Sequence, residues 1–229
     1  MKGDEFRPAE RRPIASRELG VMQKLSAWLT RSGISANAIS VTGIFFAAAA
    51  SIALIATSRV DSAPTVRALW LVAAAMVQLR LLANLMDGMV AVASGEASPV
   101  GELYNEVPDR VADALILIGL GYAAGGAPTM GYGAALLAVF VAYVRAMGAV
   151  AGARQCFAGP MAKPHRMFLV TVVSLYCAIA PSSWQPLHAG SGWGAAAIAL
   201  AVISLGCAIT AFRRIRIVAD DLRKQETGT

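Results

Sequence analysis

The chain has 229 residues, of which 57% are hydrophobic and 15% are charged. Soluble domains contain about 45–50% apolar and about 25% charged residues, so a disordered tail and a charged solution module are excluded. The formal net charge is +6. The Lys and Arg residues of the chain stand at the ends of apolar runs and form no single stripe, which argues against a nucleic-acid partner.

A charged segment opens the chain, and an amphipathic pattern follows it. Residues 1–15 contain two prolines among charged side chains, a composition that favours a flexible start. From Ser16 onward, apolar residues recur at three- and four-residue steps, namely Leu19, Met22, Leu25 and Leu29. This spacing predicts an amphipathic interfacial helix on a membrane surface, with a helix packed on protein as the alternative. Gly33 then favours a helix stop, and Ser35 or Asn37 can cap the next helix.

Six apolar runs occupy the rest of the chain. They lie at roughly 37–57, 68–87, 109–127, 131–153, 165–181 and 191–213. A helix needs a run of about 20 residues to cross a bilayer core, and the fifth run is the shortest. We therefore expect an all-α polytopic membrane protein with six transmembrane helices. Because no linker rich in Pro, Gly or Ser divides residues 16–229, they are expected to form one membrane domain.

Basic residues gather in alternate segments between these runs. Seven Lys and Arg precede the first run and five lie from Arg213 to Lys224, whereas the loops 123–131 and 182–192 contain none. The positive-inside rule then places both termini and residues 87–113 on the cytoplasmic side of a cell (inner) membrane. An even number of spans agrees with this, since it leaves both termini on one side.

Two arginines and several small residues lie inside the runs. A guanidinium in the hydrocarbon costs about 2.5–3.5 kcal/mol on insertion scales, so Arg80 and Arg145 are expected to face a polar cavity. For Arg145, an internal ion pair is the alternative. Three cysteines without metal-ligand spacing are expected to be packed thiols. Glycines four residues apart allow helices to approach closely and permit a homodimer, namely Gly121 with Gly125 and Gly148 with Gly152.

The most informative stretch lies between the second and third runs. Asn84 and Asp87 are three residues apart and share one helix face. Asn105, Asp109 and Asp113 are four residues apart and share another. If the two faces converge, oxygen atoms line a pocket, and hard divalent cations such as Mg²⁺ or Mn²⁺ prefer such oxygens. Acidic helix caps are the alternative, but they account for one Asp and not for five polar residues in register.

This stretch resembles the signature of the CDP-alcohol phosphotransferases, D-x-x-D-G-x-x-A-R-x8-G-x3-D-x3-D. The chain reproduces its spacing without a gap at Asn84, Asp87, Gly88, Ala91, Gly101, Asn105 and Asp109. The run from Ile34 to Ser40 is similar to the start of the family's first span. The segment from Tyr143 to Ala146, followed by Gly159 to Arg166, resembles its fourth helix and the next loop. The resemblance therefore covers nearly the whole chain.

The resemblance implies a helical membrane enzyme of phospholipid biosynthesis. Such enzymes move a substituted phosphate group from a CDP-linked lipid or alcohol donor to an alcohol acceptor and release CMP. The implied metal-ligand positions are Asn84, Asp87, Asn105 and Asp109. Asp109 is also the implied catalytic base, and the implied nucleotide-binding stretch contains Gly88, Ala91 and Gly101. Two cations can offset the diphosphate charge, while a carboxylate beside the acceptor hydroxyl removes its proton.

Three positions depart from the family pattern. Asn replaces Asp at 84 and 105, and Val92 replaces the family arginine. An amide oxygen can still bind a metal, but each change removes a charge, and a charge pair at about 4 Å is worth about 4 kcal/mol near a protein surface. A register that uses Asp109 and Asp113 as the last two acids is an alternative that loses the glycine match. Nearby acids either restore negative potential or are ordinary surface residues, namely Glu102, Glu106 and Asp113.

Basic residues near the fourth and fifth runs indicate a second part of the site. Arg145, Lys163 and Arg166 are interpreted as a clamp for a phosphate or an anionic headgroup, with positive-inside anchoring as the alternative. The leading hypothesis is therefore an active CDP-alcohol phosphotransferase with altered metal ligands. The alternatives are a catalytically silent relative that binds a nucleotide or headgroup, and a small transporter that uses the same polar cavity.

Overall fold

The structure is a computed structural model that describes residues 19–95 and 99–227. Within these residues the expected all-α class is confirmed, and the expected flexible segment 1–15 lies outside them. The helices are α1 (Gly20–Arg31), α2 (Ala36–Ala56), α3 (Ala63–Ala93), α4 (Pro99–Tyr122), α5 (Pro128–Val150), α6 (Lys163–Ile179), the short 3₁₀-helix η2 (Ser182–Trp184) and α7 (Ala195–Thr227).

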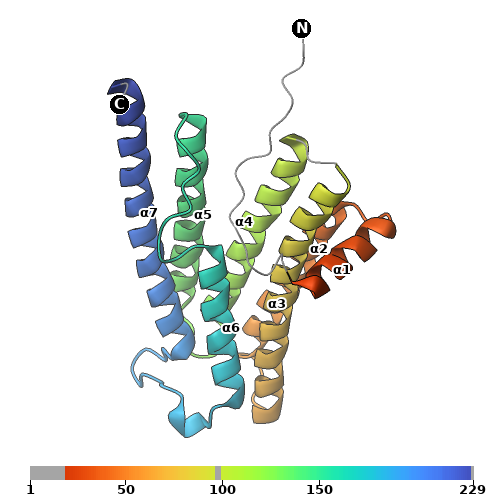
Figure 1. Ribbon diagram of the computed structural model, residues 1–229. Coiled ribbons are helices and arrows are strands. Elements are labelled where there is room, and N and C mark those ends of the chain that lie inside the picture. The colour runs from red at the N-terminus through yellow and green to blue at the C-terminus, as the bar shows by residue number, and fades with distance from the viewer. Residues whose placement is uncertain (1–18, 96–98, 228–229) are drawn as a thin grey trace.

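The helices α2 to α7 run alternately up and down and close into a ring (Figure 1). Around the ring, α2 packs between α3 and α4, α5 packs between α4 and α7, and α6 packs between α7 and α3. The short helix α1 packs on α3. In Figure 1, α6 begins well below the upper ends of α5 and α7, so its first residues lie part-way down the bundle and not at its rim.

Local sequence signals account for several helix ends. Gly33 follows α1 with a φ of 70°, a left-handed conformation that favours glycine, as the sequence predicts. Ser35 caps α2, because its side-chain oxygen accepts the backbone N–H of Ala38 at 3.2 Å. Proline stands in the first turn of α3, α5 and α6, where its missing N–H costs no helical hydrogen bond.

Among the described residues, four helices are long and apolar enough to cross a membrane, namely α2, α3, α5 and α7. Large apolar side chains on the bundle are exposed, among them Phe45, Leu136 and Leu205. Exposed apolar surface on such helices needs a lipid environment, so the chain is a membrane protein. The other two expected spans coincide with α4, whose first half carries several charges, and with α6, which has 17 residues. Crossing by all six helices stays a prediction.

The helices around the polar stretch are longer than the apolar runs that predicted them. The helix α3 continues to Ala93 and does not end near 87, and α4 begins at Pro99 and not near 109. The helix α7 likewise extends to Thr227, past the expected end at 213. Backbone hydrogen bonding continues a helix regardless of side-chain polarity, so hydropathy ended these elements too early. The candidate ligand positions consequently all lie within helices.

Close packing between helices uses some of the predicted glycines. A Cβ on Gly121 of α4 would lie 3.0 Å from the Cα of Gly131 in α5, and one on Gly148 would lie 2.8 Å from a valine side chain of α7. Gly125 and Gly152 instead follow the helix ends with φ of 69° and 95°, so they serve turns. The three cysteines are buried and unpaired, as predicted.

Candidate functional site

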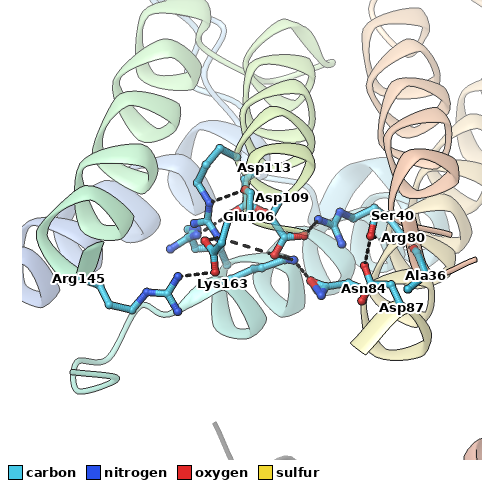
Figure 2. A network of polar contacts seen from close by, with 12 residues as sticks. Ala36, Ser40, Arg80, Asn84, Asp87, Glu106, Asp109, Asp113, Arg145 and Lys163 are labelled. Carbon is cyan, nitrogen blue, oxygen red and sulfur yellow. Dashed lines mark hydrogen bonds and ion pairs between the residues drawn. The ribbon is translucent and has the colours of Figure 1, made fainter. Parts of the chain in front are cut away.

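Buried charge is concentrated where α3, α4 and α6 meet (Figure 2). The charged residues that are buried there are Arg80, Asp87, Asp109, Asp113 and Arg166. Burying a charge without a partner is costly, so these side chains have to satisfy one another or a ligand. The three helices therefore share one polar centre inside an otherwise apolar bundle.

Acidic residues on one face of α4 form ion pairs with basic residues of different neighbouring helices. Glu106 pairs with Arg145 of α5 at 2.5 Å, and Asp113 pairs with Arg166 of α6 at 2.5 Å. Asp109 lies between them and contacts both α3 and α6. Residues three and four positions apart lie on one helix face, so α4 presents a single acidic face to its neighbours.

Asp109 lies at the centre of the cluster (Figure 2). Its side chain is 11% exposed, and the Nζ of Lys163 lies 2.5 Å from its Oδ2. Arg80 pairs with Asp109 Oδ1, and Arg110 lies 3.7 Å from Asp109 Oδ2. Lys163 also donates to the amide oxygen of Asn84. One lysine of α6 therefore joins two of the predicted metal-ligand positions, one on α3 and one on α4.

The other two predicted ligand positions keep oxygen atoms without a protein partner. Ser40 of α2 donates to Asp87 Oδ2 at 2.7 Å. Asp87 Oδ1 and Asn105 Oδ1 are buried and have no hydrogen-bond partner among the described residues. A buried polar oxygen of this kind is rare and calls for a cation, a water molecule or a substrate group. Carboxylate and amide oxygens are both of the type that a hard divalent cation such as Mg²⁺ or Mn²⁺ prefers.

The predicted metal-ligand set contains two carboxylates and two amides. Lys163 already contacts Asn84 and Asp109. Within this set, the buried oxygens without a hydrogen-bond partner among the described residues are Asp87 Oδ1 and Asn105 Oδ1, and outside it Asp113 Oδ1 also lacks one. The described part of the chain holds no group of three or more His, Cys, Asp or Glu side chains placed to bind a metal ion. With this donor set the site fits one divalent cation better than two.

The predicted nucleotide-binding stretch lies where α3 ends and α4 begins. Gly88 is buried in α3, and Ala91 and Gly101 are half-buried on either side of the junction. Val92, at the family's arginine position, is 62% exposed and brings no charge. The role of these residues in nucleotide binding stays a prediction.

Each basic residue of the predicted clamp has an acidic partner on α4. Arg145 is ion-paired, as in the alternative interpretation, and its guanidinium lies 5.6 Å from the centre of the Phe157 ring. The side chain of Arg166 is 1% exposed and donates to the Met161 carbonyl oxygen at 3.0 Å, so it is enclosed by protein and supports the site from the interior of the bundle. Arg145 and Lys163 keep more exposed surface, 21% and 14%.

Sequence reasoning missed residues that hold the site in place. Ser40 belongs to a family-like run, but no sequence signal marks its hydrogen bond to Asp87. Arg214 of α7 is buried and donates to the carbonyl oxygens of Ala158 and Val141 at 2.9 and 3.0 Å. These bonds fix the loop after α5 against the bundle. In the sequence Arg214 stands among other basic residues and resembles a positive-inside anchor.

A cavity of about 470 Å³ opens between the loop after α5 and the end of α7. Residues 154–158 line one side, and Asp220, Asp221 and Lys224 contribute charge on the other. Asp221 accepts the backbone N–H of Arg154 at 2.8 Å. Because its lining charges have both signs, this cavity is not a dedicated phosphate pocket.

Comparison with solved structures gives the fold. The phosphatidylinositol phosphate synthase PgsA1 of Mycobacterium tuberculosis with CDP-DAG bound matches with a TM-score of 0.69 and 16% identity, over 87% of this chain and 94% of that chain. The same enzyme with manganese and citrate matches with a TM-score of 0.68 and 16% identity, over 86% and 88%. Its apo form gives a TM-score of 0.66 and 17% identity, over 85% and 94%.

Comparison with curated proteins gives a shorter match. The chain is similar to the bifunctional IPC transferase and DIPP synthase of Rubrobacter xylanophilus, with 43% identity over 74 residues. The match covers 31% of this chain and 17% of the length of that protein. No protein-family model matches the chain. Since PgsA1 is a CDP-alcohol phosphotransferase, the resemblance seen in the sequence is confirmed in the architecture, and the chain has the CDP-alcohol phosphotransferase fold.

Proposed function

We propose that the chain transfers a substituted phosphate group from a CDP-linked donor, CDP-diacylglycerol or a CDP-alcohol, to an alcohol hydroxyl and releases CMP. The observation that carries the proposal is the buried Asp109, which lies at a signature position and is joined through Lys163 to a second one, Asn84. A protein of the same fold with CDP-DAG bound supports this donor class. The reaction would serve phospholipid biosynthesis in a cell (inner) membrane, with both termini cytoplasmic.

The cation of this site would be held by Asp87 and Asn105, with Asn84 and Asp109 beside them. The buried Oδ1 atoms of Asp87 and Asn105 support this assignment. When bound, Mg²⁺ or Mn²⁺ would offset the charge of the donor diphosphate. Manganese in a structure of the same fold supports a divalent ion. Gly88, Ala91 and Gly101 would approach the nucleotide where α3 and α4 meet.

Asp109 is the proposed catalytic base. Its ion pairs with Arg80 and Lys163 hold the carboxylate in place at a signature position, and a positioned carboxylate can accept the proton of an acceptor hydroxyl. As the acceptor oxygen bonds to the donor phosphorus, its hydroxyl proton passes to Asp109. The bond between that phosphorus and the CMP oxygen breaks, and CMP leaves.

Arg145 and Lys163 are the proposed contacts for an anionic headgroup or phosphate. The partner of Arg145, Glu106, has a side chain that is 48% exposed, so solvent reaches this pair and a phosphate can replace the carboxylate. Arg166 would position Lys163, because it fixes the first turn of α6 to the Met161 carbonyl.

A catalytically silent relative is the second candidate, and one observation favours it. Asn84 and Asn105 lack two charges that the signature carries, and a lysine contacts one of the two amides. Such a protein would bind a CDP-linked nucleotide or a headgroup without turnover.

The test is CMP release by the full chain in lipid nanodiscs, given CDP-diacylglycerol or CDP-linked headgroups with a panel of alcohols and Mg²⁺ or Mn²⁺. Release that depends on both donor and acceptor is the expected result. Saturable donor binding without CMP release would favour the silent relative. Neither binding nor release with any donor would contradict both candidates.

A further inference from the structure

Lys163 is the first residue of α6 and reaches two other helices. Its Nζ donates to Asn84 Oδ1 on α3 and lies 2.5 Å from Asp109 Oδ2 on α4. Both acceptors stand at positions where the resemblance implies metal ligands. The inference rests on the proposed function, because only that function makes these two positions part of a metal site. We propose that the Lys163 ammonium is a built-in cation, which takes the place of one divalent ion between Asn84 and Asp109.

Positive charge matches or exceeds negative charge around this lysine. The buried acids here are Asp87 and Asp109, and Asp109 is paired with Arg80, Lys163 and, at 3.7 Å, Arg110. Two negative and three positive charges leave no net negative charge for a pair of divalent ions. A second divalent ion beside the ammonium would be repelled at short range in a poorly hydrated site.

The amide at position 84 suits an ammonium. An amide oxygen is a neutral acceptor, whereas the carboxylate of the family pattern adds a full negative charge. The ammonium of Lys163 brings one positive charge, whereas a divalent ion brings two. With an amide at position 84 in place of the carboxylate of the family pattern, the site has one negative charge fewer, which matches the smaller charge of the ammonium. The buried oxygens of Asp87 and Asn105, which lack a hydrogen-bond partner in the described residues, would serve one exchangeable ion.

The fold holds the ammonium in place. Arg166 lies one turn after Lys163, so the two side chains share a face of α6, and both pair with acids of α4. The loop before α6 is fixed as well, because the Met161 backbone N–H donates to Thr210 of α7 at 2.9 Å. In Figure 1 this start of α6 lies part-way down the bundle, and there Lys163 contacts Asp109 of α4. Lys163 is therefore part of the site and not a flexible anchor at the membrane surface.

The test measures Mn²⁺ binding by electron paramagnetic resonance with the full chain in nanodiscs and no substrate. The variant is Lys163→Met, which keeps an unbranched side chain one atom shorter and removes the charge. We expect it to bind a second ion, or to bind Mn²⁺ at least about tenfold more tightly than the wild type, because the competing cation is gone. The matched control is Lys24→Met on the exposed face of α1, which should leave binding unchanged.

Equal Mn²⁺ affinity and stoichiometry in wild type and Lys163→Met, or weaker binding by the variant, would overturn the inference. If Lys163→Met does not fold, the number of Mn²⁺ ions bound by the wild type tests the inference. One bound ion with the spectrum of an isolated Mn²⁺ upholds the inference, and no ion or a spin-coupled pair overturns it. Because substrate is absent from this measurement, failure to release CMP would contradict the proposed function alone.

Discussion

Arg166 of α6 and Asp113 of α4 form an ion pair at 2.5 Å in which the two side chains are only 1% and 2% exposed. Arg166 donates in addition to the Met161 carbonyl oxygen at 3.0 Å. Since neither charge is solvated by bulk water, loss of one partner would leave the other as an uncompensated buried charge. The pair thereby ties the first turn of α6, and Lys163 with it, to α4.

Asp113→Ala should lower the free energy of unfolding by about 3–5 kcal/mol, because it leaves the Arg166 guanidinium buried without a counter-charge. Denaturant unfolding in detergent micelles measures the loss. Replacing both partners, Asp113→Leu with Arg166→Met, should recover much of it. The exposed pair of Asp220 and Arg223 provides the control, and Asp220→Ala should cost less than about 1 kcal/mol. Wild-type stability of Asp113→Ala would contradict the structural role of the pair.

Asp109→Asn should reduce CMP release by about 10²–10⁴-fold, the usual contribution of a general base. The amide cannot accept the hydroxyl proton, although it keeps the size of the side chain. Turnover of the purified variant in nanodiscs measures the effect, and elution as a single species in size-exclusion chromatography shows that it is folded. Asp220→Asn, far along α7, is the matched control and should retain activity. Wild-type turnover by Asp109→Asn would exclude the proposed base.

Arg145→Ala should raise KM for the donor or the acceptor by about tenfold or more, since a hydrogen bond to a charged group is worth about 1.5–3 kcal/mol. Glu106→Gln keeps the guanidinium and removes only its acidic partner, so it should bind substrate at least as well as the wild type. Steady-state kinetics of both variants make the comparison, with Arg59→Ala in the loop after α2 as the control. Unchanged constants in Arg145→Ala would mean that this arginine has a structural or orienting role only.

Reporter fusions after Gly126 and after Arg223 should lie on opposite sides of the membrane. The loop before α5 has no Lys or Arg, whereas the end of α7 has several, and the positive-inside rule separates them. An alkaline phosphatase fusion is active outside the cytoplasm and a fluorescent protein fusion inside it. Reporters on the same side would contradict the six-span topology and, with α5 and α7 crossing, would show that α6 does not cross.

The helices and their order could be predicted from the sequence because both depend on local features. Apolar runs of bilayer length marked the six helices of the ring, and Gly33 and Ser35 marked a stop and a cap. The apolar runs predicted the wrong helix ends at the polar junction, where α3 and α4 continue as helices among charged side chains. Backbone hydrogen bonds hold those turns, and hydropathy does not detect them.

The partners inside the site could not be predicted, because they depend on which helices meet in space. Lys163 and Asn84 are 79 positions apart, and Arg80 and Asp109 are 29 apart. The chain offers 14 acids to 20 Lys and Arg, so pairing by charge alone leaves many combinations open. The signature spacing placed the predicted ligand positions on α3 and α4, and each set lies on a single helix face. It gave no sign that a lysine from α6 would join them.

Asn105→Asp should tighten Mn²⁺ binding by about tenfold or more, because a carboxylate adds a charge where the amide supplies only a ligating oxygen. The buried Asn105 Oδ1, which has no hydrogen-bond partner among the described residues, is the atom that would gain this role. Isothermal titration with Mn²⁺ measures the change, and Gln23→Glu on exposed α1 adds the same charge away from the site. Chelation should stop turnover of the wild type, and turnover that survives a chelator would contradict the metal requirement. If the wild type releases no CMP but the double variant Asn84→Asp with Asn105→Asp does, the natural chain is a silent relative whose lost charges explain its inactivity.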